Sequence, residues 1–490
     1  MHDAEALTGT SAEQRFFMIQ KDRISRLRRL LPVVFALAWP TMLEELMHTL
    51  VQYIDTAMVG QLGTAATAAV GSTTTVNWLV GSTISAFGIG FLAYISQALG
   101  AEDPDRAKKA SAQSVLAVLV TGSFFTVLTV GLADCVPGWM QVGKDLRPMA
   151  ARYFRILYLP MLFRTASMIF GTVLRAAGDT KKPMAVGVVM NLINVILNFF
   201  LIYRTRTVRI FGLRVTLWGA GLGVTGAAIA SAIAFTLGGI VITAALFRHK
   251  TISPRGHSFL PDAGVLRPCM RVAIPNMLQR FATSLGYVVF ASMINSIGDL
   301  ATAAHTVANT VESAFYIPGF GMQAAAATLT GNAIGARDRQ RLKDLTVLII
   351  ALEVGMMVIS GGLLFAFAPQ MVRIFSHDPK VIALGSTVLR MVALSEPIYG
   401  VSIVIEGMMQ GAGKTRAPFA FNVVGMWGVR IFGTFLCTRF FDGGLVSAWA
   451  CMIGHNILLC ILFVLYYRYG RWNPMILPKK QRTPEIPASE

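Results

Sequence analysis

Long apolar segments dominate the chain and follow one another along most of its 490 residues. A helix needs roughly 20 apolar residues to cross a hydrocarbon core about 30 Å thick. Only 14% of the residues are charged and 54% are hydrophobic, whereas soluble domains carry about 25% charged residues. Inside lipid a helix satisfies its own backbone hydrogen bonds. The pattern therefore predicts a helical integral membrane protein.

Twelve such segments are separated by short stretches rich in Gly, Pro and charge, and each is expected to form one transmembrane helix. The expected fold is all-α, with an N-terminal tail at 1–30, a six-helix bundle at 31–247, a cytoplasmic linker at 248–267, a second six-helix bundle at 268–467 and a C-terminal tail at 468–490. The predicted helices cover 32–56, 67–98, 109–134, 147–176, 183–204, 219–247, 268–297, 303–333, 345–367, 383–411, 417–437 and 445–467.

Basic residues fix the expected orientation of these helices. The formal net charge is +18, from 43 Lys and Arg against 25 Asp and Glu. Of the basic residues, 28 fall on the face that carries both tails, 10 on the opposite face and five within the spans. The positive-inside rule then places both termini in the cytoplasm, as a multi-pass protein of the cytoplasmic (inner) membrane without a cleavable signal peptide. Charges spread along a membrane border indicate contact with anionic lipid rather than with nucleic acid.

The sequence carries no motif for a resident metal or cofactor. Its five cysteines are scattered without CxxC spacing, which argues against a disulfide framework or a zinc site. The segment 411–415 reads GAGKT, like the end of a phosphate loop, but Met408 stands where that loop needs its first Gly. A tight turn between two helices is the simpler interpretation, and no cofactor is expected.

The two halves of the chain repeat one another. Pro40 and Thr180 correspond to Pro275 and Thr415 at one constant offset of 235. After the fifth helix the offset is 220, so the first half carries 15 extra residues around 204–218. Because each half has an even number of helices, both enter the membrane in the same direction. Such parallel repeats are related by a pseudo-twofold axis along the membrane normal, as in transporters that bind substrate between the halves.

Several segments together resemble the multidrug and toxic compound extrusion (MATE) family, over roughly residues 30 to 467. The resemblance implies two six-helix bundles, alternating access, and exchange of diverse, often cationic, small organic substrates for Na⁺ or H⁺. We expect a monomer whose partners are substrate, coupling cation and membrane lipids. The segments that carry the resemblance are YIDTAMVG at 53–60, PNMLQ at 275–279, ESAFYIPGFG at 312–321, and the turns AGDT at 177–180 and AGKT at 412–415, each followed by a proline.

Three acids lie on the first predicted helix, where an ionised side chain at mid-bilayer costs roughly 2.5–3.5 kcal/mol. Glu44, His48 and Asp55 share one helix face, with Glu45 and Gln52 beside it. We expect this face to line water or protein. Asp55 could bond a neighbouring helix, and Glu44 and Glu45 could pair with Arg280 or another arginine inside the membrane, rather than bind an ion.

The resemblance implies that the aspartate at position 55 belongs to a cation or proton site in the N-terminal bundle. In the family the fifth helix supplies Asn and then Asp four residues later. Here that pair is Asn194 and Asn198, so one acid has become an amide. The site is expected to couple through Asp55, Asn194 and Asn198, with Glu44 and Glu45 contributing charge, and Asp55 is the expected position for any transported Na⁺.

The second half carries further polar residues inside predicted helices. His305, Asn309 and Glu312 form a stripe on the eighth helix, and Glu312 aligns by the repeat with Asn77. Glu406, near the end of the tenth helix, could reach the interface instead of binding an ion. The residues expected to line a substrate cavity are His48, Gln52, Asn77, Gln279, His305, Asn309, Glu312, Glu396 and Tyr399.

Two other functions remain open at this point. A flippase of lipid-linked saccharides has the same architecture, but it would favour a basic cavity, whereas the stripe on the first helix is acidic. A membrane-embedded enzyme is the second alternative. No HExxH motif or nucleophile with a base is found on adjacent spans, so we expect no enzymatic activity.

Overall fold

The computed structural model describes residues 12–140, 142–210, 213–441 and 443–473; the outer parts of the two predicted tails, 1–11 and 474–490, lie outside the described residues. The first half contains α2 (Ala12–Gly60), α3 (Thr64–Gly100), α4 (Pro104–Gly131), α5 (Val136–Trp139), α6 (Arg147–Tyr158), α7 (Met161–Ala176), α8 (Lys181–Ile202), β1 (Arg204–Ile210), β2 (Leu213–Ala220) and α9 (Val224–Phe247).

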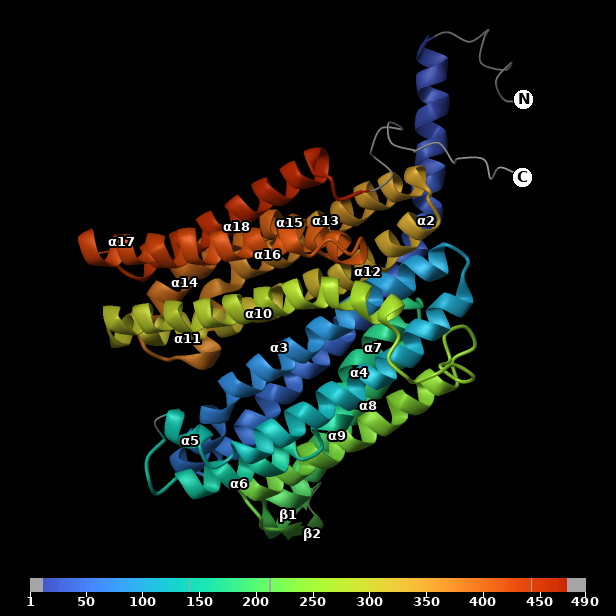
Figure 1. The fold of residues 1–490 in the computed structure, drawn as a ribbon. Coiled ribbons are helices and arrows are strands. Elements are labelled where there is room, and N and C mark those ends of the chain that lie inside the picture. The colour runs from blue at the N-terminus through green and yellow to red at the C-terminus, as the bar shows by residue number, and fades with distance from the viewer. Residues whose placement is uncertain (1–11, 141, 211–212, 442, 474–490) are drawn as a thin grey trace.

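The second half repeats the order of crossings, without the strands and without a separate counterpart of α5 (Figure 1). It contains α10 (Ala263–Ile297), α11 (Asp299–Phe315), α12 (Ile317–Gly335), α13 (Arg339–Phe375), α14 (Pro379–Ala393), α15 (Glu396–Gly411), α16 (Arg416–Val423), the π-helical segment η1 (Val424–Ile431), α17 (Phe432–Phe440) and α18 (Leu445–Tyr469).

These elements form the twelve expected crossings. Within the described residues, eight helices are long and apolar enough to span a membrane, and two bent pairs bring the number to ten. The bent pairs, α6 with α7 and α14 with α15, turn by 49° and 53°. The remaining two crossings are α10 and the pair α11–α12, which the 235-residue offset aligns with α2 and α3. The expected twelve-helix, two-bundle fold is confirmed.

The backbone repeats the register that the sequence predicts. Glu102 and its repeat partner Arg337 are the non-glycine residues with positive φ in the described chain, at 58° and 54°. The next residue in each half, Asp103 or Asp338, caps the following helix by accepting a hydrogen bond from a backbone N–H. Equal and unusual backbone geometry at one offset shows that the two halves are structural copies.

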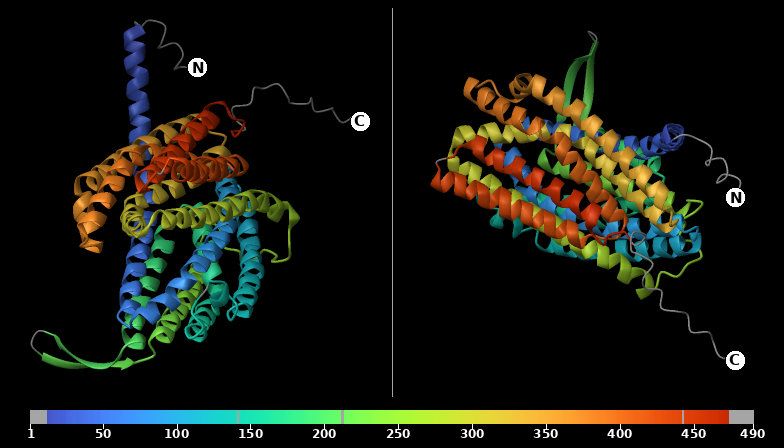
Figure 2. Two further views of the ribbon diagram at one scale, coloured as in Figure 1. Left: turned by 90° about the vertical axis from the view of Figure 1, so that its left-hand side faces the viewer. Right: turned by 90° about the horizontal axis from the view of Figure 1, so that it is seen from above.

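The extra residues of the first half form a β-hairpin, which the sequence reading did not predict. Strands β1 and β2 pair antiparallel, with Arg209 opposite Arg214 and Val208 opposite Val215. The hairpin projects from the first half, away from the second (Figures 1 and 2). It is an addition to an otherwise helical fold and carries none of the predicted site residues.

The two halves lie side by side, but α2 bridges them. Its early residues Val34 and Ala38 pack in a core cluster with Met322 of the second half. Arg26 donates to the Asp344 carboxylate at 2.9 Å. The helix therefore begins well before residue 31, where the first bundle was expected to start. Similarly, the predicted linker is non-helical only as far as Asp262, and α10 begins at Ala263.

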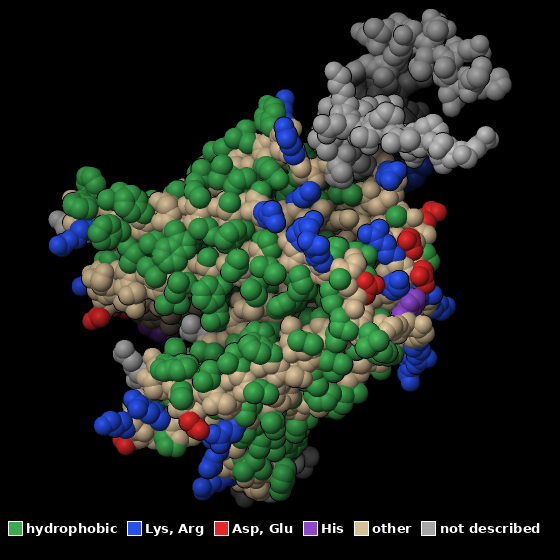
Figure 3. Space-filling model, in the orientation of Figure 1, with side chains coloured by type: hydrophobic (Ala, Val, Ile, Leu, Met, Phe, Trp, Pro, Cys, Tyr) green, Lys and Arg blue, Asp and Glu red, His purple; other side chains and the backbone are tan. Residues whose placement is uncertain are grey.

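We call the end where α2 enters and α18 leaves the inner end, and the opposite end the outer end. At the inner end the halves touch through backbone. A Cβ on Gly100 would lie 2.1 Å from the Asn332 carbonyl oxygen, and one on Gly335 would lie 2.0 Å from that of Gln97. At the outer end a notch separates the halves (Figure 3). The molecule is thus closed at the inner end and open at the outer end.

Candidate functional site

Asp55 meets two amides inside the first half. The Asn198 amide nitrogen of α8 donates to Asp55 Oδ1 at 2.6 Å. With its nitrogen turned toward α2, Asn194 lies 3.0 and 3.2 Å from the two carboxylate oxygens, and Ser231 of α9 then donates to its oxygen at 3.0 Å. The acid and the amide pair of the predicted coupling site are therefore in direct contact.

The sequence of α8 places its amides toward the protein. Asn191, Asn194 and Asn198 are buried, with Gly187 on the same face. Leu192, on the other side, is 58% exposed. An apolar helix that hides its polar stripe is the arrangement lipid imposes. The Asn198 side-chain oxygen is buried and has no hydrogen-bond partner in the described chain, so it can accept from water or ligate a small cation beside the carboxylate.

Glu44 forms an ion pair, which is the alternative left open above, but with a different arginine. Arg175 of α7 donates to both Glu44 oxygens, at 2.9 and 3.0 Å. Glu45 lies within electrostatic range of Arg175 and of Arg280 in the second half. His48 is exposed on the same helix. Glu44 is therefore tied up within the first half, whereas Glu45 faces the contact between the halves.

Two more predicted cavity residues of the first half differ in their surroundings. Asn77 accepts hydrogen bonds from Tyr158 at 3.3 Å and from Arg164 at 2.5 Å. Gln52 is exposed on α2, near Asp55. Asn77 thus holds an arginine in place, whereas Gln52 is exposed about one helical turn before Asp55.

Glu406 is the centre of a second, largely buried polar cluster, in the second half. Gln279 of α10 and Gln410 of α15 donate to its Oε1 at 2.8 and 3.2 Å, and Asn422 of α16 donates to Oε2 at 3.4 Å. By the 235 offset, Gln279 and Gln410 correspond to Glu44 and Arg175 of the first half. Glu406 is therefore bonded inside the protein and does not reach the interface, and Gln279 is occupied as its donor.

The predicted stripe on α11 is split by the structure. His305 accepts a hydrogen bond from the Trp449 indole nitrogen at 3.2 Å and packs edge-on against that ring. Asn309 is exposed, whereas Glu312 is buried. Only Glu312 turns toward the other acids of this half. His305 is part of the packing between α11 and α18.

Three carboxylates gather in the second half, and sequence reasoning missed one of them. Glu312, Glu396 and Glu353 of α13 are all buried, and Glu396 interacts electrostatically with the other two. Within the part of the chain that the structure describes, both Glu353 oxygens and one Glu396 oxygen lack hydrogen-bond partners. Tyr399 is half-buried and lies within electrostatic range of Glu396. The signal for Glu353 was available, since it is the one acid inside the predicted span 345–367.

The match to a known protein family occurs twice, once in each half of the chain. The family model MatE matches residues 40–200 and 275–436, so the two matches begin at the paired prolines. A probable multidrug resistance protein NorM of Thermotoga maritima is 25% identical over 96% of this chain and 98% of its own. The multidrug export protein MepA of Staphylococcus haemolyticus is 23% identical over 80% of this chain and 83% of its own.

Solved structures share the fold. An outward-facing multidrug resistance MATE family transporter of the MOP superfamily superposes with a TM-score of 0.81 at 21% identity, over 89% of this chain and 94% of that one. A MOP superfamily transporter from Pyrococcus furiosus gives 0.83 at 21% identity, over 91% and 96%. The matched segments cover more than half of the sequence in both halves. The chain belongs to the MatE family of multi-pass membrane transporters.

Proposed function

We propose that the protein exports small organic compounds in exchange for Na⁺ or H⁺. The observation that carries the proposal is the half-buried Asp55 carboxylate, held by Asn198 and Asn194 in the first half. Relatives named as multidrug resistance or export proteins support the direction and the kind of substrate. The acidic stripe on α2 favours cations over the pyrophosphate of a lipid-linked saccharide.

The proposed cycle uses the two ends differently. In the state described here the outer end is open, so an external cation or proton can reach Asp55 from the notch. Ion binding biases the equilibrium only if the ion binds one state more tightly than the other. Binding at Asp55 would neutralise the carboxylate and release its hold on α8, which favours the alternative packing of α2. Substrate and ion would then use the cavity in turn.

Orientation follows the charge distribution. With the inner end in the cytoplasm, the outer notch opens to the external side of the inner membrane. Both termini are then cytoplasmic, and one chain contains both halves needed for alternating access. We propose that the monomer is the working unit.

Purified protein in liposomes tests the proposal. A cationic dye loaded inside should leave when an inward Na⁺ gradient or an inward proton gradient is imposed across the membrane. One of the two gradients should raise the efflux rate well above that of protein-free liposomes. Dye release that responds to neither gradient would contradict an ion-coupled exporter, and movement of labelled lipid-linked saccharide instead would support the flippase.

A further inference from the structure

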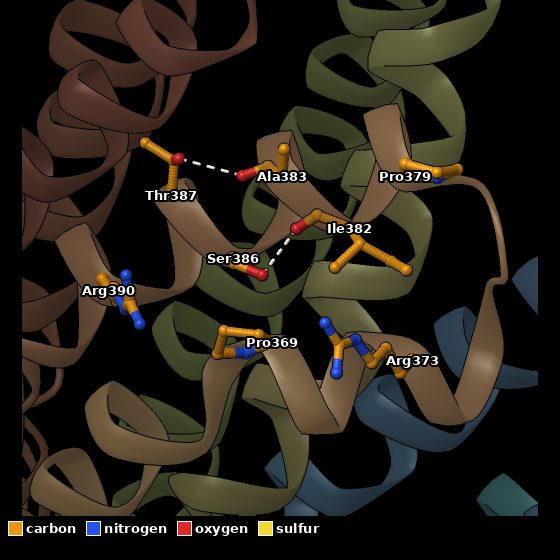
Figure 4. A pocket seen from close by; sticks show the side chains of 8 residues that line it. All are labelled: Pro369, Arg373, Pro379, Ile382, Ala383, Ser386, Thr387 and Arg390. Atoms are coloured by element: carbon orange, nitrogen blue, oxygen red, sulfur yellow. Dashed lines mark hydrogen bonds between the residues drawn. The ribbon is translucent and has the colours of Figure 1, made fainter.

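A cavity of about 370 Å³ lies between α13 and α14, near their outer ends (Figure 4). Two arginines, Arg373 and Arg390, line it on either side of Pro369. The hydroxyls of Ser386 and Thr387 also line it, but they donate to carbonyl oxygens of their own helix. The hydrogen-bond donors left for a ligand are therefore the two guanidinium groups.

Arg390 has no carboxylate partner among the described residues. It donates to the Phe365 carbonyl oxygen at 3.3 Å and lies 5.7 Å from the centre of the Phe365 ring. Arg373, in the last turn of α13, is exposed and has no ion pair in the described part of the chain either. Two positive charges thus share one concave site, and neither forms an ion pair with a described carboxylate.

In the first half, the arginine at the corresponding position has a carboxylate partner. The counterpart of Arg390 in the first half is Arg155, which pairs with Asp134 at 2.6 Å. The offset of 235 that relates these arginines places Pro369 opposite Asp134, and Arg373 opposite Gly138. At the same place in the fold, the second half therefore has a proline in place of the carboxylate and an arginine in place of the glycine.

The surroundings of the cavity are apolar and exposed. On the same helices and just beyond them, Phe365 is 44% exposed, Ile374 69% and Leu394 72%. In a membrane protein such a surface faces lipid. Arginines beside lipid need an anionic partner or must extend to the interface. Guanidinium groups match phosphate oxygens in geometry, often with two parallel hydrogen bonds.

We propose that this cavity binds the phosphate of an anionic phospholipid from the leaflet at the outer end. The headgroup phosphate lies between Arg373 and Arg390, and the acyl chains cover the exposed apolar residues beside them. A free phosphate ion would satisfy the same donors but would gain nothing from that apolar surface. The lipid therefore replaces, from outside, the carboxylate that Asp134 supplies in the first half.

Native mass spectrometry of the full chain in detergent, titrated with phosphatidylglycerol or phosphatidylcholine, tests this site. The double variant Arg373→Gln/Arg390→Gln should bind its tightest phosphatidylglycerol roughly tenfold or more weakly, with phosphatidylcholine unchanged. Arg155→Gln is the matched control and should bind as the wild type does. Equal phosphatidylglycerol binding by the double variant and the wild type would overturn the proposal.

A second variant keeps both arginines. Pro369→Asp restores the carboxylate of the first half, so Arg390 should pair within the protein and phosphatidylglycerol binding should again fall. Unchanged binding in Pro369→Asp would contradict the role of the missing carboxylate. Competition by millimolar inorganic phosphate as effective as that of the lipid would identify the ligand as free phosphate and overturn the lipid assignment.

Discussion

The two halves share one backbone but not one set of acids. Asp55 of the first half corresponds by the repeat to Phe290, and Glu353 and Glu396 of the second half correspond to Val118 and Met161. Residues 102 and 337 nevertheless have nearly equal, unusual φ angles. The fold is therefore duplicated, whereas these three carboxylates stand at positions where the other half is apolar.

The acids also differ in how they are held. Asp55 is half-buried and hydrogen-bonded by amides of α8. Glu353 is fully buried, and neither of its oxygens has a hydrogen-bond partner among the described residues. A carboxylate with preset donors and an opening to water is organised to exchange an ion. One without donors is a source of instability in this conformation.

Where the two halves meet, a negative charge of the first half lies near a positive charge of the second half. Glu45 and Arg280 are repeat partners, and they lie within electrostatic range of each other. Positions that face their own counterpart across a pseudo-twofold lie near its axis. The network from Arg175 through Glu44 and Glu45 to Arg280 therefore crosses from one half to the other.

The largest effect on stability is expected from removing the ion-pair partner of Glu44. Arg175→Ala leaves a mostly buried carboxylate without its cation, which should cost about 3 kcal/mol of unfolding free energy. Its counterpart Gln410→Ala removes one of three donors to Glu406 and should cost about 1 kcal/mol. Thermal unfolding in detergent measures both. The comparison of the halves fails if Gln410→Ala costs as much as Arg175→Ala; Arg175→Ala/Glu44→Gln should recover part of the loss.

The second test is a core substitution that should increase the unfolding free energy, whereas most core substitutions decrease it. Glu353→Met removes two unpartnered oxygens from a buried site and should raise the unfolding free energy by about 1–2 kcal/mol. Asp55→Leu should lower it by about 1–3 kcal/mol, because the Asn198 amide loses its acceptor. Denaturation curves of the two variants should shift in opposite directions. Shifts in the same direction would remove the distinction between bonded and unbonded acids.

Much of this fold could be predicted from the sequence. The apolar segments, the 235 offset and the charge on the loops are local or one-dimensional signals, and they give twelve crossings in two halves. The start of α2 could not be predicted, because Arg26 and Val34 are held by contacts with the second half. The hairpin at 204–220 was predicted only as an insertion, because its two strands pair with each other and are not part of a larger sheet.

The site was predicted less completely. Asp55 and Asn198 were chosen by resemblance, and the structure brings them together across 143 residues. The partner of Glu44 was not foreseen, because Arg175 lies next to a turn and reaches back along its helix. His305 was expected in the cavity, but only packing against Trp449, distant in sequence, decides its surroundings.

The smallest expected effect concerns the inner-end turns, which also differ between the halves. His249, just after α9, lies with its Nε2 3.7 Å from the carboxylate of Asp179 in the first-half turn. Its Nδ1 accepts hydrogen bonds from the backbone of Thr251 and Ile252 at 3.2 and 3.3 Å. Burial, together with Lys182, lowers the pKa of His249, and Asp179 partly opposes this. The neutral ring therefore stabilises the fold above the ordinary pKa of about 6.5, and the stabilisation is lost as the pH falls through the lowered pKa.

Hydrogen exchange measures this effect, expected to be about 1 kcal/mol or less. The amides of Thr251 and Ile252 should lose protection at acidic pH, after correction for intrinsic exchange rates. The second-half turn at 412–415, which has no histidine in its sequence, serves as the control and should keep its protection. Equal loss at Thr251 and Ile252 and in the turn at 412–415 would point to global destabilisation rather than to His249.

The central claim is that Asp55, rather than the acids of the second half, couples the ion to export. Dye efflux from liposomes under the effective ion gradient tests it most directly, with wild type, Asp55→Asn and Glu353→Gln at equal protein content. Asp55→Asn should lose at least roughly tenfold in gradient-driven rate, or about 1.4 kcal/mol, while remaining folded, and Glu353→Gln should retain most of it. Wild-type efflux by Asp55→Asn would contradict the account.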